Sequence, residues 1–150
     1  MTSEVSQKCR YALRALFELA RRYGEGPLTV GRIAEAQAIP QRFLETILSQ
    51  LRQGEFVVSR RGVDGGYMLA RRPEDLTAGE VIRFVDGPVG PVGCLAEGGE
   101  GDCPLRGRCA FMDMWRQARD AVADVYDSTT LRNLLEAGAA AGVALPNYCI

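Results

Sequence analysis

The segment Thr29-Val-Gly-Arg-Ile-Ala-Glu-Ala-Gln-Ala-Ile-Pro-Gln-Arg-Phe-Leu-Glu-Thr-Ile-Leu-Ser-Gln-Leu-Arg-Gln-Gly54 decides the fold of this chain. Thr29 can cap a short helix that carries Ile33 and Ala34 inward. After Ile39-Pro40 a longer helix is predicted, and Gly54 is expected to end it as a left-handed cap residue. Its predicted buried stripe consists of Phe43, Leu44, Ile47, Leu48 and Leu51. A short helix, a tight turn and a longer helix are typical of a helix-turn-helix.

The residues that follow predict a β-hairpin. Residues 56–60 and 67–70 are strand-like, and the glycine-rich stretch 61–66 separates them. A hairpin directly after a helix-turn-helix is typical of a wing. Arg60 and Arg61 at its base could reach phosphates or enter a minor groove. The alternative interpretation is a solvated turn whose arginines only confer solubility.

Two further helices flank this unit. Ser6 can cap a helix over about residues 7–23, in which apolar residues recur at helical spacing: Leu13, Leu16, Phe17, Ala20 and Tyr23. After the hairpin, Thr77-Ala-Gly-Glu80 is a capping box that opens a short helix. The predicted fold class is therefore mainly α with a small β-hairpin wing.

A long amphipathic helix is predicted from Ala110 onward. Its apolar residues alternate at spacings of three and four: Phe111, Trp115, Ala118, Val122 and Val125. This pattern gives a coiled-coil-like seam of about two heptads. The seam could pack inside its own subunit, but its length and one-sided apolar face favour a two-fold partner helix. Ser128 is expected to cap a last helix over residues 129–137.

Three of the five cysteines, Cys94, Cys103 and Cys109, lie in one short segment rich in glycine and proline. Three thiolates and one further ligand suit an iron–sulfur cluster (2Fe–2S or 4Fe–4S) or zinc. Cys9 lies in the first turn of a helix, where the helix dipole lowers a thiol pKa, so Cys9 of a partner subunit could be the fourth ligand. Alternatively, Cys9 is a small residue that fills a packing site. Cys149 is expected to be an unpaired bystander.

Together these elements divide the chain into four regions. Residues 1–86 form a winged helix-turn-helix, 87–109 a sensor segment, 110–137 the dimerisation helix with a final short helix, and 138–150 a tail. The chain has no histidine, which removes the usual catalytic base. It also shows no phosphate loop, so an enzyme is not expected. No secretory signal or membrane-spanning run is visible, and a cytoplasmic protein is expected.

The charge distribution suggests where nucleic acid would bind. Residues 1–85 hold 13 basic and 10 acidic side chains, whereas residues 86–150 hold 5 and 9. A moderately basic N-terminal half suits phosphate contacts. Direct readout is expected from Gln41, Arg42, Glu45, Thr46 and Ser49 on the second helix of the helix-turn-helix, with Gly65 and Tyr67 of the wing completing the interface. Glu45 could instead form only a surface ion pair with Arg42.

Four stretches together resemble the Rrf2-type winged-helix regulators. They are Arg10-Tyr-Ala-Leu-Arg-Ala-Leu16, Phe43-Leu-Glu-Thr-Ile-Leu48, Arg61-Gly62 with Gly65-Gly-Tyr-Met-Leu-Ala70, and Cys103-Pro-Leu-Arg106. The resemblance covers about residues 5–137. It implies a homodimeric transcription factor, with each long helix crossing its partner. Many members hold an iron–sulfur cluster on three loop cysteines.

The match has departures at the proposed cluster. Eight residues separate Cys94 from Cys103, more than in many relatives. Met112 stands where one branch has a histidine ligand, and Arg10 lies near the position from which other branches draw an acidic ligand of the partner subunit. The sequence thus predicts a DNA-binding homodimer, a repressor of a double-stranded operator, controlled by a cluster or by the redox state of the three cysteines. The alternative is a cluster-free or zinc-bound regulator that responds to a metabolite or to a protein partner such as a metabolic enzyme.

Overall fold

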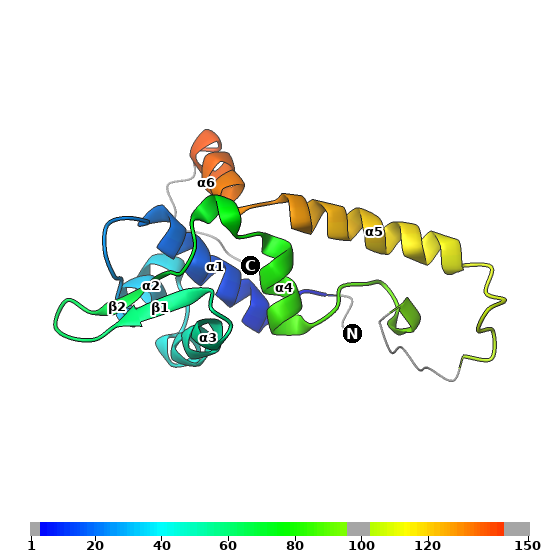
Figure 1. Ribbon diagram of the computed structural model, residues 1–150, viewed down its shortest axis with the longest axis horizontal. Helices are drawn as coiled ribbons and strands as arrows, with labels where there is room; N and C mark the ends of the chain where they lie inside the picture. The colour runs from blue at the N-terminus through cyan, green and yellow to red at the C-terminus, as the bar shows by residue number, and fades with distance from the viewer. Residues whose placement is uncertain (1–3, 96–102, 143–150) are drawn as a thin grey trace.

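The computed structural model describes residues 4–95 and 103–142 of the chain (Figure 1). Its helices and strands follow in this order: α1 Gln7–Arg21, α2 Val30–Gln37, α3 Gln41–Gln53, β1 Val57–Arg60, β2 Gly66–Leu69, α4 Ala78–Asp86, α5 Met112–Ser128 and α6 Leu131–Ala140. Two short 3₁₀ turns lie at Pro73–Asp75 and Gly93–Leu95. The structure confirms the predicted class, a mainly helical fold with one small antiparallel hairpin.

One hydrophobic core joins the elements of the winged unit. Its large, fully buried side chains come from α1, α2, α3, the base of the hairpin, the turn before α4, α4 and α6: Leu16, Ile33, Leu44, Leu48, Leu51, Val57, Leu76, Val81 and Leu131. Helix α6 packs on α1, so the chain returns to the winged unit after α5. No described helix is long and apolar enough to cross a membrane.

Helix α1 begins as predicted but ends earlier. The Ser6 hydroxyl oxygen accepts a hydrogen bond from the Cys9 N–H at 3.0 Å, which caps the helix. The helix ends at Arg21, so Tyr23 lies beyond it and is exposed. Inside the helix, Glu18 is buried and accepts hydrogen bonds from Arg21 and from Gln37 of α2, both at 2.9 Å. These bonds satisfy a buried carboxylate and hold α2 on α1.

Both helices of the helix-turn-helix begin as predicted, but α3 buries a different face. The Thr29 hydroxyl caps α2, and Pro40 precedes α3. Between them the chain turns through Ala38, whose φ is 49°. Leu44, Ile47, Leu48 and Leu51 are buried, but Phe43 is 51% exposed and does not belong to the stripe. Phe43 precedes Leu44, and one residue turns a helix by about 100°, which points its ring away from the core.

The end of α3 differs from the prediction. Gly54 has φ −82°, so it is not a left-handed cap, and the positive φ of 62° occurs at Glu55. Glycine is required at position 54 for another reason. A Cβ there would come within 2.5 Å of the Phe84 ring of α4. Close packing with α4 therefore favours glycine at position 54, and Glu55 is the left-handed residue of the turn.

The hairpin forms the predicted wing. Strands β1 and β2 pair antiparallel, with Ser59 opposite Tyr67 and Arg60 opposite Gly66. Leu28, before α2, exchanges two backbone hydrogen bonds with Tyr67, at 2.9 and 2.7 Å. The base of the wing is thereby fixed to the helix-turn-helix.

The C-terminal helices begin later than predicted. Helix α5 begins at Met112 and includes Ser128, which therefore does not cap the last helix. Thr130 caps α6 instead, in a capping box with Asn133. Helix α5 extends away from the winged unit, as Figure 1 shows, and none of its residues is fully buried.

Candidate functional site

The exposed face of α3 carries the residues that were predicted to read bases. Gln41, Arg42, Glu45 and Thr46 are exposed, and Ser49 is half-buried. Glu45, Thr46 and Ser49 line one shallow polar hollow with Gln50 and Gln53. These two glutamines were not among the predicted contacts. Gln50 follows Thr46 by four residues and Gln53 follows Ser49 by four, and this helical spacing was the signal that could have found them.

Within this face the carboxylate of Glu45 and the guanidinium of Arg42 have separate partners. Glu45 accepts a long hydrogen bond from Gln41 Nε2, at 3.4 Å. The Arg42 guanidinium lies 5.3 Å from the centre of the Phe43 ring, a cation–π geometry. The described part of the chain shows no ion pair between Arg42 and Glu45. Phe43, which the sequence analysis placed in the core, is thus part of the exposed face.

The wing presents two cations next to this face. Arg60 and Arg61 are exposed, and neither forms an ion pair with any residue in the described ranges 4–95 and 103–142. Arg52, near the end of α3, donates a hydrogen bond to the Ser59 hydroxyl of β1 at 3.2 Å. This bond connects the two elements that carry the candidate contacts. Two unpaired guanidinium groups at the edge of a hairpin suit phosphate oxygens.

The two other wing candidates have structural roles as well. A Cβ on Gly65 would lie 2.3 Å from the Arg60 carbonyl oxygen, so only glycine permits this tight tip. Tyr67 is half-buried, packs against the core and pairs its backbone with Leu28. The Gly65 N–H also donates to the Gly62 carbonyl at 3.0 Å, so Gly65 shapes the tip and the ring of Tyr67 supports the wing.

The three segment cysteines are accessible but separate in this subunit. Cys94 and Cys103 are exposed, and Cys109 is half-buried. The carbonyl of Cys109 accepts a hydrogen bond from the Met112 N–H at 3.3 Å, at the start of α5. Among the described residues, no group of three or more His, Cys, Asp or Glu side chains lies together as a metal site. Cys149 lies outside the described residues.

Cys9 is in a different environment from the one expected. Its side chain is fully buried. Burial raises the pKa of the Cys9 thiol to about 12, and the neighbouring Asp86 carboxylate adds to the rise. The expected lowering of this pKa by the helix N-terminus is therefore wrong, because the thiol is removed from water and lies beside the Asp86 carboxylate. A buried neutral thiol is a poor metal ligand.

The last turn of α4 connects three other elements. Arg83 donates two hydrogen bonds to Asp127 of α5, at 2.5 and 2.7 Å, which lower the pKa of the Asp127 carboxyl. The Phe84 ring packs against Gly54 at the end of α3. Asp86 accepts hydrogen bonds from the N–H and the hydroxyl of Ser6, at 2.8 and 2.5 Å. The chain leaves this turn directly into the connector, residues 87–93, that leads to Cys94.

The chain is similar to a family of known transcriptional regulators. Residues 5–137 match the family model Rrf2, described as an iron-dependent transcriptional regulator. The chain is 40% identical to the HTH-type transcriptional regulator CymR of Bacillus subtilis, across 87% of this chain and 88% of that protein.

Two solved structures share the fold. CymR of B. subtilis, described as its global cysteine regulator, has a TM-score of 0.74 at 38% identity, across 89% of this chain and 96% of that one. IscR of T. potens has a TM-score of 0.72 at 32% identity, across 95% and 93%.

Proposed function

Because this chain belongs to the Rrf2 family of transcriptional regulators, we propose that it is a homodimeric repressor whose operator affinity depends on a metal centre held by Cys94, Cys103 and Cys109. The family and the named relatives make it a DNA-binding regulator and not an enzyme. The proposal adds three statements to this: which residues contact DNA, that the cysteines hold a metal centre, and that the protein represses transcription.

The observation that carries the DNA interface is the common exposure of α3 and the wing. Arg42 and Gln41 stand at the start of α3, where a recognition helix would meet base edges in a major groove. Arg60 and Arg61 lie on the hairpin joined to the same helix through Arg52. Bidentate arginine contacts would read guanine, and the wing arginines would fix the register on the phosphates.

The chemistry of the donor set supports a metal centre. Two of the three thiols are exposed and the third is half-buried, so each can meet a metal supplied from solution. Thiolate ligands suit an iron–sulfur cluster, and zinc is the alternative. Binding would require the three cysteines to move together. Cys9 is buried and is not one of the proposed ligands.

A second candidate follows from the similarity to CymR. CymR of B. subtilis is 40% identical to this chain and is described as a cysteine regulator. This similarity supports a cluster-free mode of control, by a metabolite or by a metabolic enzyme as protein partner. In that mode the three cysteines would act as free thiols or would bind zinc for structure only.

Anaerobic purification separates these functions. A cluster would give visible absorbance and bound iron, and Cys94→Ala, Cys103→Ala and Cys109→Ala should each abolish both. Cys9→Ala is the matched control and should retain the cluster. Three unchanged spectra among the segment variants would refute the metal centre.

DNA binding is tested on the same preparations. A labelled duplex, obtained by selection from genomic fragments, is titrated with holoprotein and apoprotein and compared with a scrambled duplex. We expect the two forms to differ in affinity for the selected duplex by about 5–150-fold, the usual range of allosteric coupling. Equal affinities of the two forms would leave a DNA-binding protein that the metal does not control.

A further inference from the structure

Phe43 is the one large apolar side chain of α3 that lies in solvent. The structure describes α3 from end to end, and its other large apolar side chains are all buried: Leu44, Ile47, Leu48 and Leu51. The Phe43 ring, by contrast, is 51% exposed. A single exposed apolar residue is common on protein surfaces. Its position on the helix therefore has to show whether the ring has a role.

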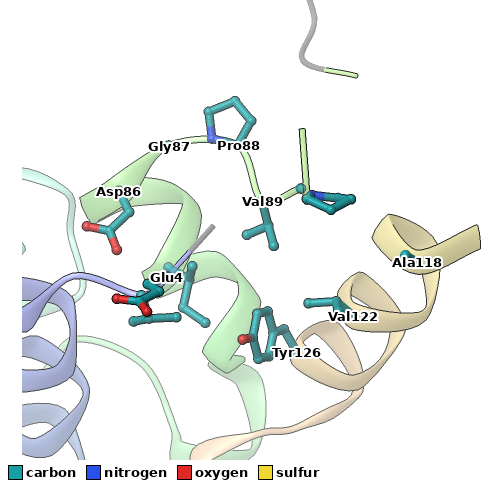
Figure 2. A pocket seen from close by; sticks show the side chains of 12 residues that line it. Glu4, Asp86, Gly87, Pro88, Val89, Ala118, Val122 and Tyr126 are labelled. Carbon is teal, nitrogen blue, oxygen red and sulfur yellow. The ribbon is translucent and has the colours of Figure 1, made fainter. Parts of the chain in front are cut away.

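A second group of exposed apolar side chains lies on α5, among them Met114, Val122 and Val125. Val122 also lines a cavity of about 260 Å³, and Figure 2 shows it opposite Val89 of the connector. These residues belong to the helix that is expected to pair the two subunits. Figure 1 shows α3 beside the wing and apart from α5. Pairing along α5 therefore does not account for the exposure of Phe43.

Phe43 lies on the flank of α3 that faces away from the wing. Each residue turns a helix by about 100°, so Phe43 is about 180° around α3 from Arg52, which donates to the Ser59 hydroxyl of β1. By the same geometry it is about 60° from Thr46 and about 20° from Gln50. Both of these residues line the polar hollow of α3. The ring thus borders the candidate recognition face on the side opposite the wing.

The neighbouring Arg42 is already in contact with this ring. Its guanidinium lies 5.3 Å from the centre of the Phe43 ring, and it forms no ion pair with any residue in the two described ranges. A cation–π contact limits the freedom of both side chains before DNA binds, which lowers the entropy lost on binding. The pair offers a polar group and an apolar group side by side.

We propose that the Phe43 ring reads a thymine, by apolar contact with its C5-methyl group, in the base pair next to the guanine that Arg42 contacts. The inference rests on the Arg42 contact of the proposed function and adds a second base to it. Among the base edges of the major groove, the thymine methyl is the apolar group. A ring without a donor or an acceptor can therefore distinguish only thymine there.

The spacing of the two residues fits two neighbouring base pairs. Consecutive Cα atoms are about 3.8 Å apart, and consecutive base pairs are about 3.4 Å apart. Arg42 and Phe43 are consecutive residues in the first turn of α3, the part of a recognition helix that meets base edges. The alternative is that the ring packs against a deoxyribose, which would add affinity but carry no sequence information.

Replacement of thymine by uracil tests the contact, because it removes only the methyl group. The selected duplex is remade with deoxyuridine at one thymidine position at a time within one half-site. For the native protein we expect one position at which affinity falls about fourfold, the effect of one buried carbon group. Phe43→Ala should bind the thymine and uracil duplexes equally at that position, whereas Phe43→Leu should retain part of the preference.

Val63→Ala is the matched control for these variants. Val63 is a fully exposed apolar residue at the tip of the wing, and its replacement should leave the full native preference for thymine. Each preference compares two duplexes on one protein preparation. A smaller folded fraction of Phe43→Ala therefore does not change the ratio.

A second base analogue locates the guanine. 7-Deazaguanine lacks the N7 acceptor, so at one guanine it should weaken binding by the native protein and leave binding by Arg42→Ala unchanged. We expect this guanine in the base pair next to the sensitive thymine. The absence of a sensitive guanine would refute the Arg42 contact of the proposed function. The thymine-to-uracil ratio tests Phe43 whether or not Arg42 reads guanine.

Three results would overturn the inference. The first is a native protein that prefers thymine to uracil at no position, and the second is the same preference in Phe43→Ala as in the native chain. The third is a sensitive thymine that does not adjoin the sensitive guanine. A loss of affinity in Phe43→Ala for both duplexes, with the native ratio unchanged, would place the ring against a deoxyribose instead.

Discussion

The ring of Phe84 occupies the space that a side chain at Gly54 would need. A Cβ at position 54 would lie between 2.5 and 2.9 Å from three atoms of the Phe84 ring. The same ring packs on Phe56 at the base of the wing, with ring centres 5.0 Å apart. Since Phe84 belongs to α4, this contact fixes the end of α3 and the start of the wing against the helix that leads to the cysteine segment.

Gly54→Ala should therefore lower the free energy of unfolding by about 1–3 kcal/mol, the usual cost of overpacking. Urea unfolding measures the change. Gly31→Ala in α2 is the matched control, because its Cβ would meet nothing closer than 3.7 Å, and it should leave stability unchanged or raise it. Phe84→Leu should recover part of the loss in the double variant. Full additivity of the two changes would contradict the contact.

The wing arginines should control the salt dependence of DNA binding. Each phosphate contact contributes about 0.9 to the slope of log affinity against log salt concentration. Arg60→Ala and Arg61→Ala should each weaken binding and make that slope shallower by about this amount. Arg72→Ala is the control, because its guanidinium already donates to Asp75 at 2.8 Å. Wild-type slopes for both wing variants would show that the hairpin is only a solvated turn.

Local sequence signals predicted most of the fold. Ser6, Thr29 and Thr77 cap the helices that they were expected to cap, because a cap depends on residues three positions away. The hairpin followed from its glycines and its two strand-like runs. The signals failed where a distant residue decides the structure. Gly54 is explained by Phe84, and no periodicity in α3 contains that information.

The candidate site was predictable by residue type but not by environment. Glutamine and arginine on α3 and arginine on the wing are exposed, as recognition chemistry requires. Cys9 shows the limit of such reasoning. Its position in the first turn of α1 suggested a thiolate, but the packing of α1 and the carboxylate of Asp86 reverse the direction of the pKa shift. Neither contact can be read from the neighbours of Cys9 in the sequence.

The thiols should differ in reactivity. Alkylation requires the thiolate. The Cys9 thiol is buried, and its pKa is raised. In native apoprotein at pH 8, iodoacetamide should therefore modify Cys94 and Cys103 at least about tenfold faster than Cys9. Peptide mass spectrometry measures the rates, and unfolding in urea should remove the difference. Equal rates in the native protein would mean that the first helix opens readily.

The buried thiol should also make stability depend on alkaline pH. A group whose pKa is raised on folding contributes stability that is fully present below its unfolded value and lost as pH rises toward its folded value. For Cys9 that window runs from about pH 9 to about pH 12. Cys9→Ala should show a shallower loss of unfolding free energy across the lower part of this window than the native chain. Parallel curves would contradict the raised pKa.

Ser6 and Asp86 connect the first helix to the end of α4. The Ser6 hydroxyl donates to Asp86 at 2.5 Å and accepts from the Cys9 N–H at 3.0 Å, so one side chain caps α1 and holds α4. Asp86 is the last residue of α4, directly before the connector. The two residues are 80 positions apart in the sequence.

Their coupling is measurable by a double-mutant cycle. Ser6→Ala removes a helix cap together with the bond to Asp86 and should cost about 1–3 kcal/mol of unfolding free energy. Asp86→Asn keeps one acceptor oxygen but loses the charge and should cost about 1–2 kcal/mol. Because both changes weaken the same contact between Ser6 and Asp86, the double variant should be more stable than the sum predicts, by roughly 0.5–3 kcal/mol. Asp113→Asn, an exposed acid in the first turn of α5, should change stability by less than about 0.5 kcal/mol. A coupling energy near zero would mean that α1 and α4 are held together by their apolar contacts alone, and that movement of the connector does not reach the first helix through Ser6.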